Sequence, residues 1–361
     1  MTKTIRAALV AAMSALALVF AGSAFASFTP KLLVKNATTA AGSGGVTITA
    51  SVAQTDDPTA AVTIYVPTGY QASTPNPGTK LGDVQATAQA ADLGGAILPL
   101  TGELDAVDPK NFETQQAQCG VATVAATWDL HLTAAGQTLD VPVFVVATAG
   151  TEQALGQFKL QICLPPPDVP QGTPGRAAFG AKLLSATFGA SALTSPTTAG
   201  EYRWRSLWTP YTPNTGKPNP AGTVEVQNAV RIPTQIRLSV GKKKLFKTTT
   251  VKGKKVKTLW TAVLVNAIVS ENAAPVGDVP VTITLNGKRL GSAKTDTSKG
   301  AVHATFLLKK GASVTVAATG VIPDRDLGAP GCTKTFAFPC NDLTVAGSTV
   351  KASVKVVAFK S

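Results

Sequence analysis

The stretch that decides the fold is Val279-Pro-Val-Thr-Ile-Thr-Leu285, followed directly by Asn286-Gly287 and then by residues 288–295. Asn and Gly both tolerate the positive φ angles of a two-residue hairpin turn, so this stretch predicts two antiparallel strands. In Val46-Thr-Ile-Thr-Ala-Ser-Val52, apolar and polar residues alternate with the period of a strand that buries one face. Val, Thr and Ile recur between clusters of Gly, Pro, Asn and Asp, and long helical patterns are missing. The sequence therefore predicts an all-β protein.

Residues 1–26 have the three parts of a secretory signal peptide: basic side chains near the start, an apolar run from Ala7 to Phe20, and the small-x-small site Ala24-Phe25-Ala26. The run is shorter than the roughly 20 residues that span a bilayer, and we expect no transmembrane segment. A bacterial lipoprotein would have a lipidated cysteine directly after the cleavage site, and this chain has Ser27 there. We therefore expect an exported bacterial protein, found in the periplasm, on the cell surface or outside the cell.

The mature chain of about 335 residues is longer than one hydrophobic core usually accommodates, which favours two domains. Charge divides the chain in the same way. Acidic residues exceed Lys and Arg by four between residues 27 and 228, whereas Lys and Arg exceed acidic residues by 15 between 229 and 361. We therefore predict an N-terminal β-sandwich domain over 27–230 and a basic β-sandwich domain over 231–361.

The residues from Val279 to Phe306 resemble bacterial immunoglobulin-like domains. The resemblance consists of a strand, an Asn-Gly turn, a second strand, and then Thr295-Asp296 and Gly300 in that order. It covers about the middle third of the second domain. It implies an immunoglobulin-like sandwich with a role in envelope spacing or adhesion, and it supplies no catalytic residue. The N-terminal domain resembles no family.

The four cysteines are an even number, which favours disulfides in an exported chain. Three pairings are possible. We predict Cys119 with Cys163 and Cys332 with Cys340, because each pair falls inside one domain and closes a short or moderate loop. No two cysteines have the Cys-x-x-Cys spacing of a zinc site, so we expect neither a metal nor a cofactor.

Few residues in the chain suit catalysis. The only histidines are His131 and His303, and strand alternation places each opposite an apolar face, outside any nucleophile motif. Glu103, Asp105 and Asp108 are the densest acidic group, and they would support glycoside hydrolysis if they converged in a cleft. A solvated turn at Asp108 is the simpler interpretation. We expect a protein that is not an enzyme.

The segment from Gly241 to Lys257 predicts a basic hairpin that turns near Lys252-Gly253. Such a ribbon could bind an anionic envelope polymer or glycan by displacing counterions. Alternatively, the lysines protect an exposed strand edge from aggregation. Specific nucleic-acid recognition is not expected, because aromatic residues that could stack on bases are nearly absent. The candidate binding residues are Lys242, Lys243, Lys244, Lys247, Lys252, Lys254, Lys255 and Lys257.

A second candidate surface is aromatic and consists of Tyr202, Trp204, Trp208 and Tyr211. Exposed rings could stack on sugars, as in a carbohydrate-binding module, whereas buried rings would belong to the core. Burial is favoured, because a chain with few aromatic residues needs them inside. The sequence as a whole predicts a non-catalytic binding or structural protein of the adhesion type. A carbohydrate-binding module and a carboxylate-based glycoside hydrolase are the alternatives.

Overall fold

The computed structural model describes residues 28–42, 44–134 and 136–360, and the expected signal peptide lies outside them. Within these ranges the chain is almost entirely β-structure, which confirms the predicted all-β class. No helix among the described residues is long and apolar enough to span a membrane. The helical segments of the described ranges are one α-helix, α2 (Glu113–Gln118), and the short 3-10 turns η1 (Ala91–Leu93), η2 (Pro109–Phe112), η3 (Gly150–Ala154), η4 (Ala178–Gly180), η5 (Pro220–Gly222) and η6 (Ala329–Gly331).

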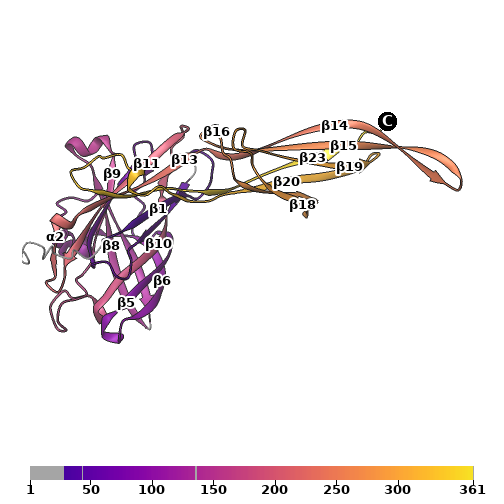
Figure 1. Ribbon diagram of the computed structural model, residues 1–361. Helices are drawn as coiled ribbons and strands as arrows, with labels where there is room; N and C mark the ends of the chain where they lie inside the picture. The colour runs from indigo at the N-terminus through magenta and orange to yellow at the C-terminus, as the bar shows by residue number, and fades with distance from the viewer. Residues whose placement is uncertain (1–27, 43, 135, 361) are drawn as a thin grey trace, which may run out of the picture.

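The first unit is a single mixed sheet that folds over on itself (Figure 1). Its main path runs in the order β1-β2-β10-β5-β6-β7-β8-β9-β3-β11-β13-β22-β21. The strands are β1 (Lys31–Asn36), β2 (Gly44–Ser51), β3 (Thr59–Val66), β4 (Gln71–Ala72), β5 (Lys80–Ala90), β6 (Ala96–Val107), β7 (Ala126–Ala134), β8 (Gln137–Ala147), β9 (Phe158–Cys163), β10 (Ala181–Thr194), β11 (Gly200–Thr212), β12 (Lys217–Pro218), β13 (Val224–Ile232), β21 (Arg325–Asp326) and β22 (Cys340–Val345).

This sheet encloses one hydrophobic core, because alternate residues of nearly every long strand point inward. Trp128 and Trp204 are among its largest fully buried side chains. Asn228, on β13, joins strands that are far apart in the path of the sheet. Its Oδ1 accepts from the backbone N–H of Val34 on β1 at 3.1 Å, and its Nδ2 donates to the carbonyl of Thr344 on β22 at 2.9 Å. The fully buried amide therefore holds the two ends of the folded sheet together.

The second unit extends from the first as an arm of two packed, sandwich-like sheets (Figure 1). Valine and isoleucine dominate its core, which includes Val265, Val281 and Val316. Asn286 and Gly287 have φ angles of 48° and 79° and form the turn expected between β17 and β18. The strands of the arm are β14 (Thr234–Val251), β15 (Lys254–Glu271), β16 (Ala274–Pro275), β17 (Pro280–Leu285), β18 (Lys288–Lys294), β19 (Ala301–Lys309), β20 (Ser313–Ile322) and β23 (Ser348–Val357).

The chain passes between the two units more than once. It leaves the first sheet at Pro233, between β13 and β14, close to the predicted boundary. The segment 323–347, which the sequence placed in the second domain, returns to the first sheet, where β22 pairs parallel with β13. This pairing satisfies the backbone of β13 on a side that would otherwise be a free edge. The range 231–361 therefore contains part of the first unit as well as the arm.

Both predicted disulfides are present. Cys119 to Cys163 connects the end of α2 to β9, and Cys332 to Cys340 closes a short loop beside β22. Their Cα atoms are 5.7 and 6.2 Å apart, within the normal range for disulfides. Two disulfides agree with an oxidising compartment.

A buried carboxylate connects the two units. Glu271, at the end of β15, is 3% exposed. Its Oε2 lies 2.6 Å from Nη2 of Arg325 on β21 and 3.4 Å from Nη1 of Arg231 on β13. Arg231 also pairs with Glu201 on β11 at 2.9 Å. The arm is therefore fixed to the first sheet by charged side chains from both units.

Replacing Glu271 with alanine leaves two arginines without their shared partner, so Glu271→Ala should lower the free energy of unfolding by about 3 kcal/mol in urea denaturation. The matched control is Asp83→Ala, which removes an ion pair whose carboxylate is 84% exposed and should change stability by less than about 1 kcal/mol. Equal effects of the two substitutions would contradict the role given to Glu271.

Candidate polyanion-binding arm

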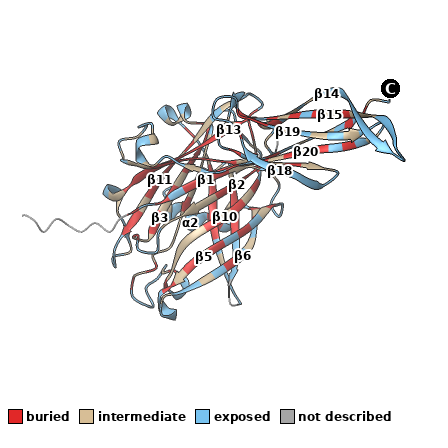
Figure 2. Ribbon diagram, turned by 45° about the vertical axis from the view of Figure 1, so that its right-hand side comes forward, coloured by how far each residue is buried: buried red, intermediate tan, exposed pale blue. Residues whose placement is uncertain are grey.

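The basic segment forms the outer end of a long hairpin. β14 and β15 pair without a break from Thr234 opposite Glu271 to Val251 opposite Lys254. Lys252 and Gly253 form the turn, with φ angles of 48° and 77°, as expected for a two-residue hairpin loop. β19 pairs with β15 only as far as Trp260, so the ribbon beyond it has two strands. Figures 1 and 2 show this exposed ribbon projecting from the end of the arm.

All eight candidate lysines are exposed. Strand alternation and register distribute them over both faces of the ribbon. One face, continuous with the buried Val263, carries Lys242, Lys244, Lys255 and Lys257, the other carries Lys243, Lys247 and Lys254, and Lys252 lies at the turn. Residues 241–257 include no Asp or Glu. In the part of the chain that the structure describes, none of the eight lysines forms an ion pair, so their charge is directed to solvent.

Three lysines at the inner end of the ribbon make cation–π contacts with aromatic rings. The Nζ atoms of Lys242 and Lys244 lie 5.3 and 5.6 Å from the centre of the Phe359 ring. The Nζ of Lys247 lies 5.1 Å from the centre of the Trp260 ring. These cation–π contacts orient the ammonium groups without neutralising them. The ribbon therefore presents a partly ordered array of positive charge.

The four aromatic candidates do not form an exposed platform, which corrects their assignment as binding residues. Trp204 is fully buried, and Trp208 and Tyr211 are nearly so. Tyr202 is half-buried and its ring lies edge-on to Tyr70. Tyr202, Trp204 and Trp208 share the inward face of β11, which lies between β3 and β13 and must fill the core. Two of the rings also use their polar atoms inside the protein, since Trp208 Nε1 donates to Ser206 and the Tyr211 hydroxyl donates to the carbonyl of Leu164.

The acidic candidates do not meet in a cleft. Glu103 forms an ion pair with Lys80 at 2.6 Å. Asp108 accepts from the backbone N–H of Lys110 and caps η2. Asp105 lies on the outer face of β6 opposite Asp129. The arrangement that a glycoside hydrolase needs is therefore not assembled from these three residues.

The two histidines lie on solvent-facing positions, as expected. His303 lies on β19 opposite Asn266 of β15. His131 lies on β7, where its Nδ1 is 2.6 Å from Oδ1 of Asp140, a residue that the sequence analysis did not single out. Nearby Asp129 is buried, and burial together with the charge of Asp140 raises the pKa of Asp129 to about 6. No hydroxyl group completes a nucleophile, base and acid arrangement among the interactions of His131.

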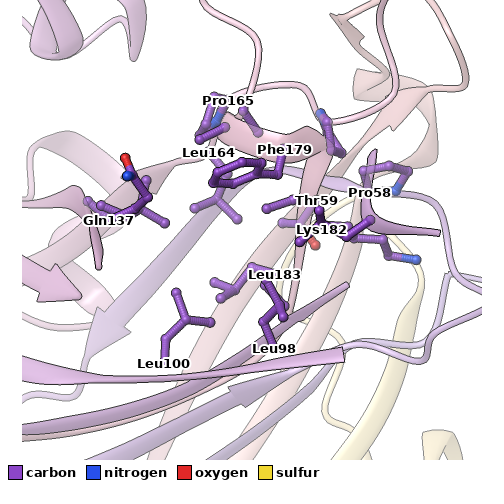
Figure 3. A pocket seen from close by; sticks show the side chains of 18 of the residues that line it. Pro58, Thr59, Leu98, Leu100, Gln137, Leu164, Pro165, Phe179, Lys182 and Leu183 are labelled. Atoms are coloured by element: carbon purple, nitrogen blue, oxygen red, sulfur yellow. The ribbon is translucent and has the colours of Figure 1, made fainter. Parts of the chain in front are cut away.

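A small apolar pocket of about 110 Å³ in the first unit is lined by residues of β5, β6, β8 and β10 (Figure 3). Its one charged lining residue is Lys182, whose Nζ donates to the carbonyls of Ala53, Gln54 and Asp56. The pocket could hold a small apolar group but has no convergent polar groups to orient a substrate. Its labelled lining residues are Pro58, Thr59, Leu98, Leu100, Gln137, Leu164, Pro165, Phe179, Lys182 and Leu183.

The fold and the site together define an all-β, disulfide-bonded protein with an arm that ends in a basic two-stranded ribbon. Comparisons with protein families, with curated proteins and with solved structures gave no match.

Because Trp204 is buried, the stability of a Trp204 variant separates a role in the core from the carbohydrate-binding alternative. Trp204→Ala should lower the free energy of unfolding by about 3 to 5 kcal/mol, because it opens a cavity in the core. Trp260→Ala, on the ribbon, should cost much less. Denaturation followed by far-UV circular dichroism measures both. Unchanged stability in Trp204→Ala together with lost binding of neutral oligosaccharides would restore the platform hypothesis.

Proposed function

We propose that the protein is an exported, non-catalytic binding and structural protein whose arm attaches it to anionic polymers of the cell envelope. The observation that supports this proposal most strongly is the charge and the position of the ribbon. Eight exposed lysines without acidic partners lie on both faces of a hairpin that projects from the arm. An anionic chain that follows the ribbon would contact several of them at once and release its counterions.

The charge on the rest of the molecule also favours binding of a polyanion at the arm. Residues 27–228 carry an excess of four acidic side chains, whereas residues 229–361 carry an excess of 15 basic side chains. A polyanion would be attracted toward the arm and repelled by the acidic body. The two disulfides support export, because such bonds persist in oxidising compartments. The resemblance of Val279 to Phe306 to bacterial immunoglobulin-like domains supports a role in adhesion or spacing.

Protection of the free edges of the ribbon is the competing explanation for the lysines. The outer parts of β14 and β15 each leave one edge unpaired, and charges beside an edge prevent pairing between copies. Either sign of charge would serve that purpose. The ribbon carries eight positive charges and no negative ones, which favours a partner of the opposite sign.

The proposal is tested by removing charge at the tip. The variant Lys252→Gln/Lys254→Gln/Lys255→Gln should elute from immobilised heparin at lower salt than the native protein. The slope of log K against log salt should fall by about 0.7 to 0.9 for each lysine that contacts the polymer. Replacing the same lysines with arginine should retain binding. Polyphosphate serves as a second probe that lacks sugars.

The matched control removes three exposed lysines from the rest of the arm, in Lys288→Gln/Lys294→Gln/Lys299→Gln. It has the same net charge as the tip variant but should retain most of the affinity. Absence of salt-sensitive binding in the native protein would refute the proposal. Equal losses in the two variants would show that net charge, rather than the ribbon, is responsible.

A further inference from the structure

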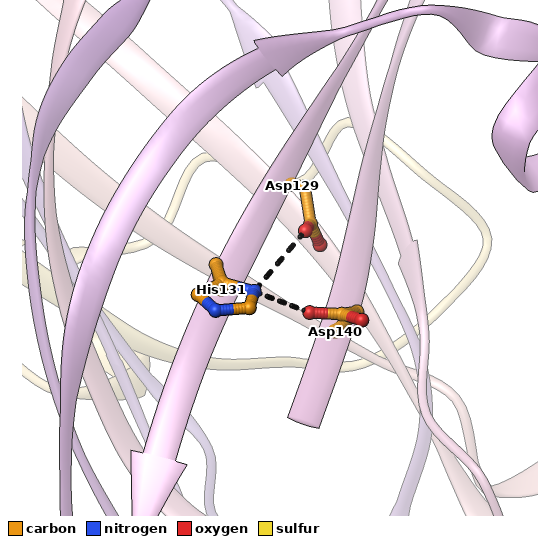
Figure 4. A group of neighbouring side chains, drawn as sticks. All are labelled: Asp129, His131 and Asp140. Carbon is orange, nitrogen blue, oxygen red and sulfur yellow. Dashed lines mark hydrogen bonds and ion pairs between the residues drawn. The ribbon is translucent and has the colours of Figure 1, made fainter. Parts of the chain in front are cut away.

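A second cluster of polar side chains lies on the outer face of β7 and β8 in the first unit (Figure 4). His131 of β7 faces Asp140 across the hairpin that β7 forms with β8. Asp129 lies two residues from His131 on the same face of β7. In Figure 4 the two carboxylates converge on one ring nitrogen of His131. The three side chains therefore come from one rigid hairpin and point to a common position.

The geometry of this cluster suits a metal ion. His131 Nδ1 lies 2.6 Å from Oδ1 of Asp140 and 4.0 Å from Oδ2 of Asp129. The three possible ligand atoms all lie within 4.8 Å of one another. An ion at about 2.0 to 2.2 Å from each ligand atom would place those atoms roughly 3 to 3.6 Å apart. Small side-chain rotations reach that arrangement, because His131 and Asp140 are half exposed.

Asp129 supplies an independent indication that a cation belongs here. The residue is only 7% exposed, and its Oδ1 is buried without a hydrogen-bond partner. Within the described ranges no lysine or arginine pairs with it, and His131 is its one ion-pair partner. A buried carboxylate that lacks a compensating charge destabilises the folded state. A bound cation would provide that compensation.

We propose that Asp129, His131 and Asp140 bind a divalent first-row transition ion such as Zn²⁺. One imidazole nitrogen and two carboxylate oxygens are ligands that zinc accepts, whereas Ca²⁺ and Mg²⁺ prefer sites made of oxygen alone. Three protein ligands leave a coordination position for water on the exposed side. Glu103 faces His131 from β6 but is held by Lys80 at 2.6 Å, so it stays outside the ligand set.

The ion cross-links β7 and β8 within their hairpin. It joins the two strands at the pair formed by His131 and Asp140, three residues from the turn pair of Ala134 and Gln137. On the opposite face of β8, Leu139 and Val141 line the apolar pocket. Metal binding therefore stabilises the wall of that pocket as well as the hairpin.

Isothermal titration of the full mature chain with Zn²⁺, disulfides intact and in a buffer that does not chelate metals, tests the proposal. We expect saturable binding with one ion per chain and a rise in melting temperature with Zn²⁺ concentration. His131→Ala and Asp140→Asn should each weaken binding by about tenfold or more. The matched control is His303→Ala, which removes the other histidine and should bind Zn²⁺ like the native protein. Circular dichroism verifies that each variant is folded.

Three results would overturn the proposal. The first is an absence of saturable Zn²⁺ binding by the native protein. The second is native affinity in both His131→Ala and Asp140→Asn. The third is Ca²⁺ binding as tight as that of Zn²⁺ and insensitive to His131→Ala, which would indicate a nonspecific acidic surface. Because His131 and Asp140 are half exposed, their substitution should leave the fold intact.

Discussion

The continuous pairing of β14 with β15 is the constraint on which the arm depends. A two-stranded ribbon alone is only marginally stable in water. Here the same two strands begin inside a packed core, where Val263, Val265 and Val269 are buried, and then continue beyond it. A slip of one residue would move that valine face to solvent, so the core fixes the register of the exposed end. The Lys252-Gly253 turn fixes it from the other side.

The arm is also tied to the first unit at several points. The chain crosses between the units before β14, after β20 and before β23. Glu271 links arginines of two strands of the large sheet to the end of β15. Lys35 of β1 pairs with Asp324, just after β20, and the same carboxylate accepts from the backbone N–H of Gly347, just before β23, so two of these crossings are held beside β1. These contacts hold the lysines at a distance from the acidic body, which keeps opposite charges of one molecule apart.

Local patterns predicted much of this structure. The hairpin turns at Lys252-Gly253 and Asn286-Gly287 follow from turn chemistry, and the disulfides follow from their position along the chain. The return of 323–347 to the first sheet could not be predicted. Leu343-Thr-Val345 fits a strand in either unit, and the parallel partner of β22 lies more than a hundred residues earlier in the chain. Charge balance, the basis for the predicted boundary, does not report strand pairing.

The candidate sites also differ in how far the sequence alone predicts them. The lysines are visible in the sequence of residues 241–257, and their register follows from the turn at Lys252-Gly253. The aromatic residues were ambiguous, because alternation along β11 shows which rings share a face but not which face is buried. Asp140 was missed although the signal was present. A turn that pairs Ala134 with Gln137 also pairs His131 with Asp140 three residues further back on each strand.

The central claim is that the basic segment is a paired ribbon in solution. Amide hydrogen exchange on the full chain tests it most directly. We expect alternate amides of β14 and β15 to be protected as far as the residues beside Gly253, with protection that decreases toward the tip. Exchange at the rate of an unstructured chain throughout residues 242–257 would show that the lysines are not arranged on a ribbon, and it would contradict the account.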